Sequence, residues 1–198
     1  MGACALGLAA AAGCRSDATD PPPRSDAPSA VADSGVGGAT SSARLVGDPE
    51  APFEALLLHD GLARGSADEA AVLGFAEGLA ERGFSVTLTG ARESLVPVRD
   101  FDLYVLAGVA AGDASPSAIG AAVGSLPQTL SRAPVAILVV GEDAIPQLPG
   151  LVSAARRRGA FVVGAKAFST SGSQTPRDDA LRILAGDYGA QVAEGLLE

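Results

Sequence analysis

One short stretch joins an apolar run to a predicted helix through glycines, a hydroxyl group and a histidine. It reads LLLHDGLARGSADEA (residues 56–70) and contains Gly61, Gly65, Ser66 and His59, the only histidine of the chain. In an open α/β sheet, a strand that leads into a helix can bind an anion, because the helix N-terminus offers backbone N–H groups and the positive end of its dipole. The stretch is therefore a candidate phosphate site.

Other chemistry at this loop is less well supported. His59, Asp60 and Ser66 could suggest a hydrolytic site, but the chain has no G-x-S-x-G turn to carry a nucleophile. A histidine at a strand end is typical of a structural hydrogen-bonding role. The two cysteines are Cys4 and Cys14, so thiolate and histidine metal sites are excluded from the rest of the chain.

Composition and charge restrict the partners. The chain has 198 residues and a formal net charge of −9, and its basic residues are scattered except at Arg156, Arg157 and Arg158. An acidic chain without a basic face argues against nucleic acid as a partner. Aromatic residues are only 4% of the chain, with no Trp, which predicts an aliphatic core.

The N-terminus has the pattern of an export signal. Its apolar run, residues 3–12, is too short to span a bilayer, which needs about 20 residues, and suits a signal peptide. The AAGC sequence ending at Cys14 resembles a bacterial lipobox, although Ala11 stands where Leu is usual and no basic residue precedes the run. We expect residues 1–14 to be a signal peptide, with Cys14 lipidated at the cell envelope; the alternative is a cytoplasmic protein with an Ala-rich start.

Residues 15–50 are rich in Pro, Ser, Gly, Ala and Asp and have no run able to bury a face. Such a composition predicts a disordered spacer, because burial cannot offset the entropy lost on ordering. Apolar runs begin at about residue 51, which predicts one domain over residues 51–198.

Within this domain, strands and helices are predicted to alternate. Short apolar runs predict five strands, at residues 53–59, 84–90, 101–108, 133–141 and 160–164. Ser66 and Glu69 have the spacing of a capping box at the start of the first helix. Helices are predicted from Ser66 to Gly83, from Ser115–Pro116, from about Pro149 to Arg158, and from Thr175–Pro176 to the end. This alternation predicts an α/β fold with a parallel sheet between helical layers.

The domain resembles the flavodoxins. EALLLHDGLARGSADEAAVLGFAEGLAERGFSVTLTGA is similar to their first strand, phosphate loop, helix and second strand, and VRDFDLYVLAGVAAGDASPSAIGAAV is similar to the third strand and flavin-contacting loop. APVAILVVG and RRRGAFVVG are similar to the fourth and fifth strands. The resemblance implies a three-layer α/β/α fold with strand order 2-1-3-4-5, and FMN bound where the strand order reverses.

The resemblance also implies which residues would contact FMN. They are Gly61, Arg64, Gly65, Ser66, Gly108, Ala110, Gly112 and Asp113. The first loop departs from the family pattern S/T-x-T-G-x-T, because Asp60 adds a negative charge and Ser66 is also the predicted helix cap. The second has alanines at 110 and 111 where the family has an aromatic ring to stack on the flavin.

Two functions remain open. One is an FMN-dependent electron carrier or oxidoreductase with a redox partner protein, and the other is a cofactor-free binding module tethered at the cell envelope. Response-regulator receivers have the same strand order but are excluded, because the predicted third strand ends in Ala107–Gly108 without a phosphoacceptor Asp. The hydroxyl-rich segment 166–176 could bind an anion, but it is more typical of a solvated loop.

Overall fold

The computed structural model describes residues 43–91, 100–110, 120, 133–170 and 178–198. The expected signal peptide, Cys14 and most of the expected spacer lie outside these residues. So do Gly112, Asp113, the predicted start of a helix at Ser115–Pro116 and most of the segment 166–176. In the described part of the chain, no helix is long and apolar enough to cross a membrane.

In the part of the chain that the structure describes, six strands form one sheet in the order β1-β3-β2-β4-β5-β6. The strands are β1 Arg44–Val46, β2 Phe53–His59, β3 Phe84–Gly90, β4 Leu103–Ala110, β5 Pro134–Gly141 and β6 Phe161–Ser169. The five strands β2 to β6 pair in parallel, and β1 pairs antiparallel with β3. Without β1, the order is 2-1-3-4-5, so the predicted strand order is confirmed.

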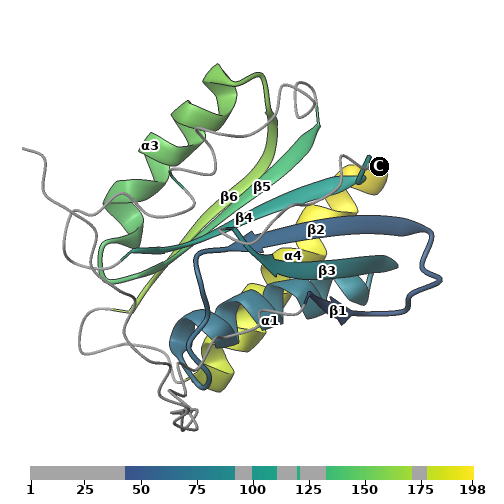
Figure 1. The fold of residues 1–198 in the computed structure, drawn as a ribbon, viewed down its shortest axis with the longest axis horizontal. Coiled ribbons are helices and arrows are strands. Elements are labelled where there is room, and N and C mark those ends of the chain that lie inside the picture. The colour runs from purple at the N-terminus through teal and green to yellow at the C-terminus, as the bar shows by residue number, and fades with distance from the viewer. Residues whose placement is uncertain (1–42, 92–99, 111–119, 121–132, 171–177) are drawn as a thin grey trace, which may run out of the picture. The chain divides into compact units, whose positions relative to one another are not determined.

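Helices cover both faces of the sheet (Figure 1). Helices α1, Ala67–Ala80, and α4, Asp178–Leu197, lie side by side on one face, and α3, Ala144–Arg157, lies on the other. Because successive side chains of a strand point to opposite faces, the buried residues divide into two clusters. Leu57 and Val105 pack towards α1 and α4, whereas Leu56 and Leu106 pack towards α3. The predicted three-layer α/β/α architecture is confirmed.

Strands β2 and β3 have the predicted bounds, and four other predictions need correction. Strand β4 continues past Gly108 to Ala110, because its last residues pair with Val139–Gly141 of β5. Strand β6 continues past Gly164 to Ser169 for the same reason, since β5 extends alongside it. Pairing with a neighbour decides where these strands end, and a single run of sequence does not contain that information.

The two other corrections concern a helix and the spacer. Helix α3 begins at Ala144, five residues before the predicted start, and it includes Pro149. Ala144 follows β5 after only two residues and is fully buried, so packing starts the helix there in spite of the proline. Residues Arg44–Val46, assigned to the spacer by composition, form β1, because β3 offers a free edge and Val46 packs against the core.

Helices α1 and α4 approach each other very closely. A Cβ added to Gly74 would collide with the backbone oxygen of Arg182, and one added to Gly78 would collide with that of Gly186. A Cβ on Gly189 of α4 would likewise meet the backbone oxygen of Phe75. The two helices therefore touch backbone to backbone, which only glycine allows at these positions.

Two exposed ion pairs flank this contact. Arg182 of α4 pairs with Glu77 of α1, and Arg82, just after α1, pairs with Glu194 at 2.7 Å. Exposed pairs contribute about 0–1 kcal/mol each. The glycine contact, more than the ion pairs, therefore fixes the spacing of the two helices.

The first prediction tests this contact. We expect Gly78→Ala to lower the free energy of unfolding by about 2–3 kcal/mol, because overpacking a close contact forces the backbone to shift. Gly150→Ala in α3 is the matched control, since no atom from the described part of the chain lies within 4 Å of its added Cβ; it should stabilise the helix by up to about 1 kcal/mol. Urea unfolding of the full chain measures both, and equal stability of Gly78→Ala and the parent would contradict the close contact.

Candidate functional site

The predicted phosphate loop lies where the strand order reverses. Strand β2 pairs with β3 on one side and β4 on the other, so that His59 is level with Gly90 and Ala107. Residues 60–66 leave this end of β2 and lead into α1. In open α/β sheets, ligands bind in the crevice outside the carboxyl ends of the strands at such a point. The loop therefore lies at the switch point of the sheet, the place where the strand order reverses.

Helix α1 begins with the predicted cap. Ser66 has extended backbone angles, φ −86° and ψ 158°, and its Oγ accepts a hydrogen bond from the Glu69 N–H at 3.1 Å. In return, Glu69 Oε2 accepts a hydrogen bond from the Gly65 N–H at 2.6 Å. A capping box usually returns this bond to the cap residue itself, and here it goes one residue earlier. The side chain of Ser66 and the N–H of Gly65 thus both form hydrogen bonds at the N-terminus of α1.

The loop before the cap is shaped by two glycines. Gly61 has φ +115° and Gly65 has φ +70°, angles that side chains other than glycine rarely adopt. The Ser66 N–H donates to the Ala63 carbonyl oxygen at 3.1 Å, which closes a turn around Gly65. Within the described residues, no atom lies within 4 Å of a Cβ placed on Gly61 or Gly65. These glycines are therefore needed for backbone conformation, and the space beside them is open.

His59 holds the start of the loop. Its Nδ1 accepts a hydrogen bond from the Gly61 N–H at 3.1 Å. An imidazole nitrogen that accepts a bond carries no proton, so this contact fits the neutral ring with its proton on Nε2. The geometry agrees with the structural role expected for His59, and it leaves the Gly61 N–H engaged.

Asp60 connects the two strands at this point. Its Oδ2 accepts a hydrogen bond from the Val109 N–H of β4 at 3.2 Å, and its Oδ1 is buried. From the sequence, Asp60 was considered with His59 and Ser66 for a hydrolytic site and as an unfavourable charge near a phosphate, but not as a link to β4. The bond to β4 joins residues 49 positions apart, so no local sequence signal could have revealed it.

The loop is also acidic. Asp60, Asp68 and Glu69 lie in or beside it, and Arg64, which is exposed, is the only basic residue between positions 60 and 70. Burial raises the pKa of the Asp68 carboxyl, because removal from water disfavours its charged form. A phosphate dianion would add two further negative charges beside these carboxylates.

These contacts test whether the loop fits the phosphate of FMN. A phosphate loop supplies backbone N–H groups that point at the anion. Here the N–H groups of Gly61, Gly65 and Val109 already donate to side-chain acceptors of the chain itself. The described residues of the loop therefore do not fit an FMN phosphate without rearrangement.

The second predicted contact region also differs from expectation. Gly108 was predicted to end the third strand and Ala110 to lie in the loop after it, but both belong to β4, opposite Val139 and Gly141 of β5. Ala110 is 2% exposed and packs in the core on the α3 side. The side chain of Ala110 is therefore part of the core and does not line a crevice.

Comparisons with known proteins agree with the fold. No family model and no curated protein matches this chain. Among solved structures, it is similar to the flavodiiron protein from Giardia intestinalis, with a TM-score of 0.55 and 14% identity over 73% of this chain and 36% of that one. It is also similar to Megasphaera elsdenii flavodoxin, with a TM-score of 0.50 and 17% identity over 66% of this chain and 98% of that one.

A third similar structure is the WrbA-like flavodoxin from Agrobacterium tumefaciens, with a TM-score of 0.50 and 14% identity over 73% of this chain and 98% of that one. The chain spans 36% of the length of the flavodiiron structures from Giardia intestinalis and Synechocystis. At these identities, the comparisons establish the flavodoxin-like fold and nothing finer.

The second prediction tests the helix cap. We expect Ser66→Ala to lower the free energy of unfolding by about 1 kcal/mol, because the Glu69 N–H loses its acceptor. Ser66→Asp should keep most of the stability, because a carboxylate also accepts that bond and favours a helix N-terminus. Urea unfolding of the full chain measures both variants. If Ser66→Ala were as stable as Ser66→Asp, the hydroxyl would not cap α1.

Proposed function

We propose that this flavodoxin-like domain is a binding module that works without resident FMN, and that a lipid on Cys14 holds it at the cell envelope. One observation carries the first part of the proposal. Backbone N–H groups at the switch point donate to His59, Glu69 and Asp60 instead of facing open space. Because these N–H groups already have side-chain acceptors, the crevice offers few free donors to a phosphate.

The expected loss of FMN affinity supports the proposal of a cofactor-free module. A neutral hydrogen bond contributes about 1 kcal/mol, and one to a charged group about 1.5–3 kcal/mol. A phosphate that displaced Asp60 and Glu69 from their N–H partners would lose these bonds and bring like charges together. Since each 1.4 kcal/mol corresponds to a factor of about ten in affinity, FMN should bind at least about a hundredfold more weakly than in a loop with free donors.

Weak binding of FMN is the second candidate. The open space beside Gly61 and Gly65 favours it, and so does the likeness to flavodoxins. If FMN binds, Gly61, Gly65 and Ser66 would lie nearest its phosphate, and Arg64 would supply a positive charge. A role in electron transfer with a redox partner protein would then return as the better hypothesis.

The third prediction separates these candidates. We expect the purified full chain to be colourless. We also expect the quenching of FMN fluorescence to remain unsaturated when the chain is added to about 100 µM, a concentration far above the Kd of a resident cofactor. Asp60→Thr should strengthen any weak binding, because it removes a negative charge beside the phosphate and adds a hydroxyl donor. Titration of FMN with each chain, followed by flavin fluorescence, measures this.

A matched control removes the same charge elsewhere. Asp100→Thr changes an exposed residue that precedes β4, at the opposite end of the sheet, and should leave FMN binding unchanged. Tight, stoichiometric quenching by the parent chain would overturn the proposal of a cofactor-free module. Equal effects of the two variants would show that FMN binds away from the switch point.

The fourth prediction concerns attachment to the membrane. We expect the full chain, produced in its native host, to sediment with membranes, and Cys14→Ala to release it, because the AAGC sequence places the lipid on that sulfur. Cys4→Ala is the matched control and should remain with the membranes. Parent chain found in the soluble fraction would contradict lipidation without affecting the proposal for the switch point.

A further inference from the structure

Charge is distributed unequally between the two helical layers. Helices α1 and α4, which share one face of the sheet, together carry seven acidic residues and one basic residue, Arg182. Helix α3, on the other face, carries two arginines and no acidic residue. Residues 114–177, which include α3 and β6, contain six basic residues and only two acidic ones, in a chain of net charge −9. The α3 side of the domain is therefore far less acidic than the α1 and α4 side.

Three consecutive basic residues lie at one corner of this less acidic side. Arg156 and Arg157 end α3, Arg158 follows them, and all three are exposed. Phe161 begins β6 three residues later and is 64% exposed (Figure 1). In the part of the chain that the structure describes, no salt bridge involves these arginines. We call this group of four residues the basic corner: Arg156, Arg157, Arg158 and Phe161.

Helix stability explains only part of the basic corner. A cation in the last turn of a helix interacts favourably with the negative end of its dipole. Successive residues of a helix point about 100° apart, so Arg156 and Arg157 reach different parts of the surroundings, and Phe161 has no role at the helix end. The acidic residues Glu142 and Asp143 precede the other end of this 14-residue helix, roughly 20 Å away. The corner therefore offers positive charge and an apolar ring to a partner.

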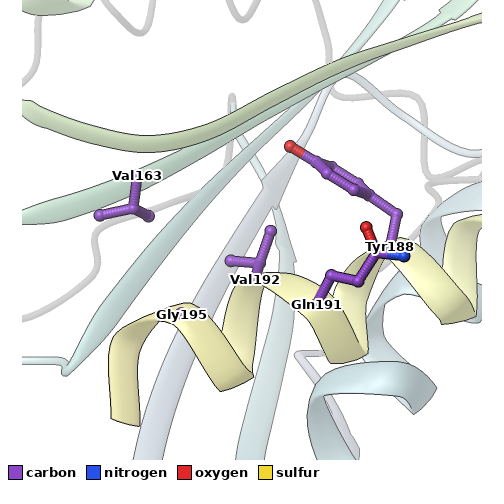
Figure 2. A pocket seen from close by; sticks show the side chains of 5 residues that line it. All are labelled: Val163, Tyr188, Gln191, Val192 and Gly195. Atoms are coloured by element: carbon purple, nitrogen blue, oxygen red, sulfur yellow. The ribbon is translucent and has the colours of Figure 1, made fainter. Parts of the chain in front are cut away.

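A pocket lies beside the start of β6, between that strand and α4. It has a volume of about 150 Å³ and is lined by Val163, Tyr188, Gln191, Val192 and Gly195 (Figure 2). Pockets for small-molecule ligands usually measure about 300–1,000 Å³, and no residue of the basic corner lines this one. The corner itself consists of exposed, projecting side chains. Such a shape suits a surface that the side chains can enter.

We propose that the basic corner docks onto an anionic lipid membrane and that the α1 and α4 face is turned away from it. Guanidinium groups bind the phosphates of lipid headgroups well, and apolar rings such as that of Phe161 enter the boundary between headgroups and acyl chains. A negatively charged surface attracts the corner and repels the acidic helices. The same charges that bind the domain therefore also orient it.

The inference rests on the proposed attachment through Cys14, which makes a weak contact sufficient. About 30 residues separate Cys14 from residue 43, the first that the structure describes. A flexible chain of that length has an average end-to-end distance of about 30 Å, so the spacer predicted from composition would keep the domain near the membrane. Linkage of this kind gives a local concentration in the millimolar range. Three arginines and one ring can then hold the domain on the surface.

The docked orientation leaves the switch point accessible. Strands β2 to β6 are parallel, so Phe161 at the start of β6 lies at the opposite end of the sheet from residues 60–66, which follow the end of β2. A membrane at the basic corner would therefore not cover the switch-point loop. A tethered binding module needs this arrangement if its partner approaches from solution.

The fifth prediction tests the contact by sedimentation with vesicles. The full chain should carry Cys4→Ser and Cys14→Ser, so that neither lipid attachment nor a disulfide contributes. We expect it to bind vesicles of equal parts phosphatidylcholine and phosphatidylglycerol at about 10 mM lipid, and to be released by about 0.5 M salt, because salt screens exposed charges. Vesicles of phosphatidylcholine alone should not bind it.

Variants of the same chain locate the contact. Arg157→Gln should lower the partition coefficient about fivefold and replacement of all three arginines about a hundredfold, because each basic residue near an anionic surface contributes separately. Phe161→Ala should lower it at least about threefold, since less apolar area enters the membrane. Arg44→Gln is the matched control: it removes an exposed arginine from β1, at the other edge of the sheet, and should bind like the parent chain. Circular dichroism should show that the variants are folded, since each changes exposed side chains.

Two results would overturn the proposal. One is a parent chain that binds anionic vesicles no better than neutral ones; if that chain bound soluble polyglutamate instead, the corner would be assigned to an acidic protein. The other is an equal loss of binding in Arg44→Gln and Arg157→Gln, which would show that only net charge matters. Because both cysteines are replaced, the result does not depend on whether Cys14 is lipidated, and failure here would leave the third and fourth predictions unaffected.

Discussion

The backbone contact between α1 and α4 is the constraint on which the rest of this fold depends. Gly74 and Gly78 let α1 approach α4 until main-chain atoms touch, and Gly189 does the same from the other helix. The pair buries the face of the sheet formed around Leu57 and Val105. Because α1 cannot move without breaking this contact, its N-terminus is fixed above the carboxyl end of β2, where Ser66 caps it.

The N-terminus of a helix carries a partial positive charge and unpaired N–H groups, which need a negative charge or acceptors nearby. In a phosphate-binding loop a ligand does this; here Glu69 and Asp60 provide negative charge, and Ser66 caps the helix. The same N–H groups cannot serve both purposes at once. Glu69 accepts a hydrogen bond beside the helix end, and Asp60 accepts one from β4. The negative charge of both carboxylates opposes an anionic cofactor.

The sequence predicted those features that short segments determine. Strand β2 is a continuous apolar run ended by His59–Asp60, and β3 lies between Gly83 and Gly90, so both had correct bounds. The capping box of Ser66 and Glu69 was equally local. The ends of β4 and β6, the pairing of β1 and the bond from Asp60 to Val109 depend on partners distant in sequence. Local patterns cannot specify such partners.

The hydrogen bonds between the loop N–H groups and the chain's own side chains also affect the stability of the fold. A protein that carries a tightly bound cofactor gains stability from it, by about 4 kcal/mol when the free ligand is a thousandfold above its Kd. A flavodoxin-like chain without that ligand must replace this contribution. The cap of α1 supplies about 1 kcal/mol, and a carboxylate at the helix N-terminus supplies about 0.3–1 kcal/mol more. In the proposed cofactor-free module, the hydrogen bonds that Glu69 and Asp60 accept would therefore occupy the donors of the loop and would also supply part of the stability that a cofactor would have given.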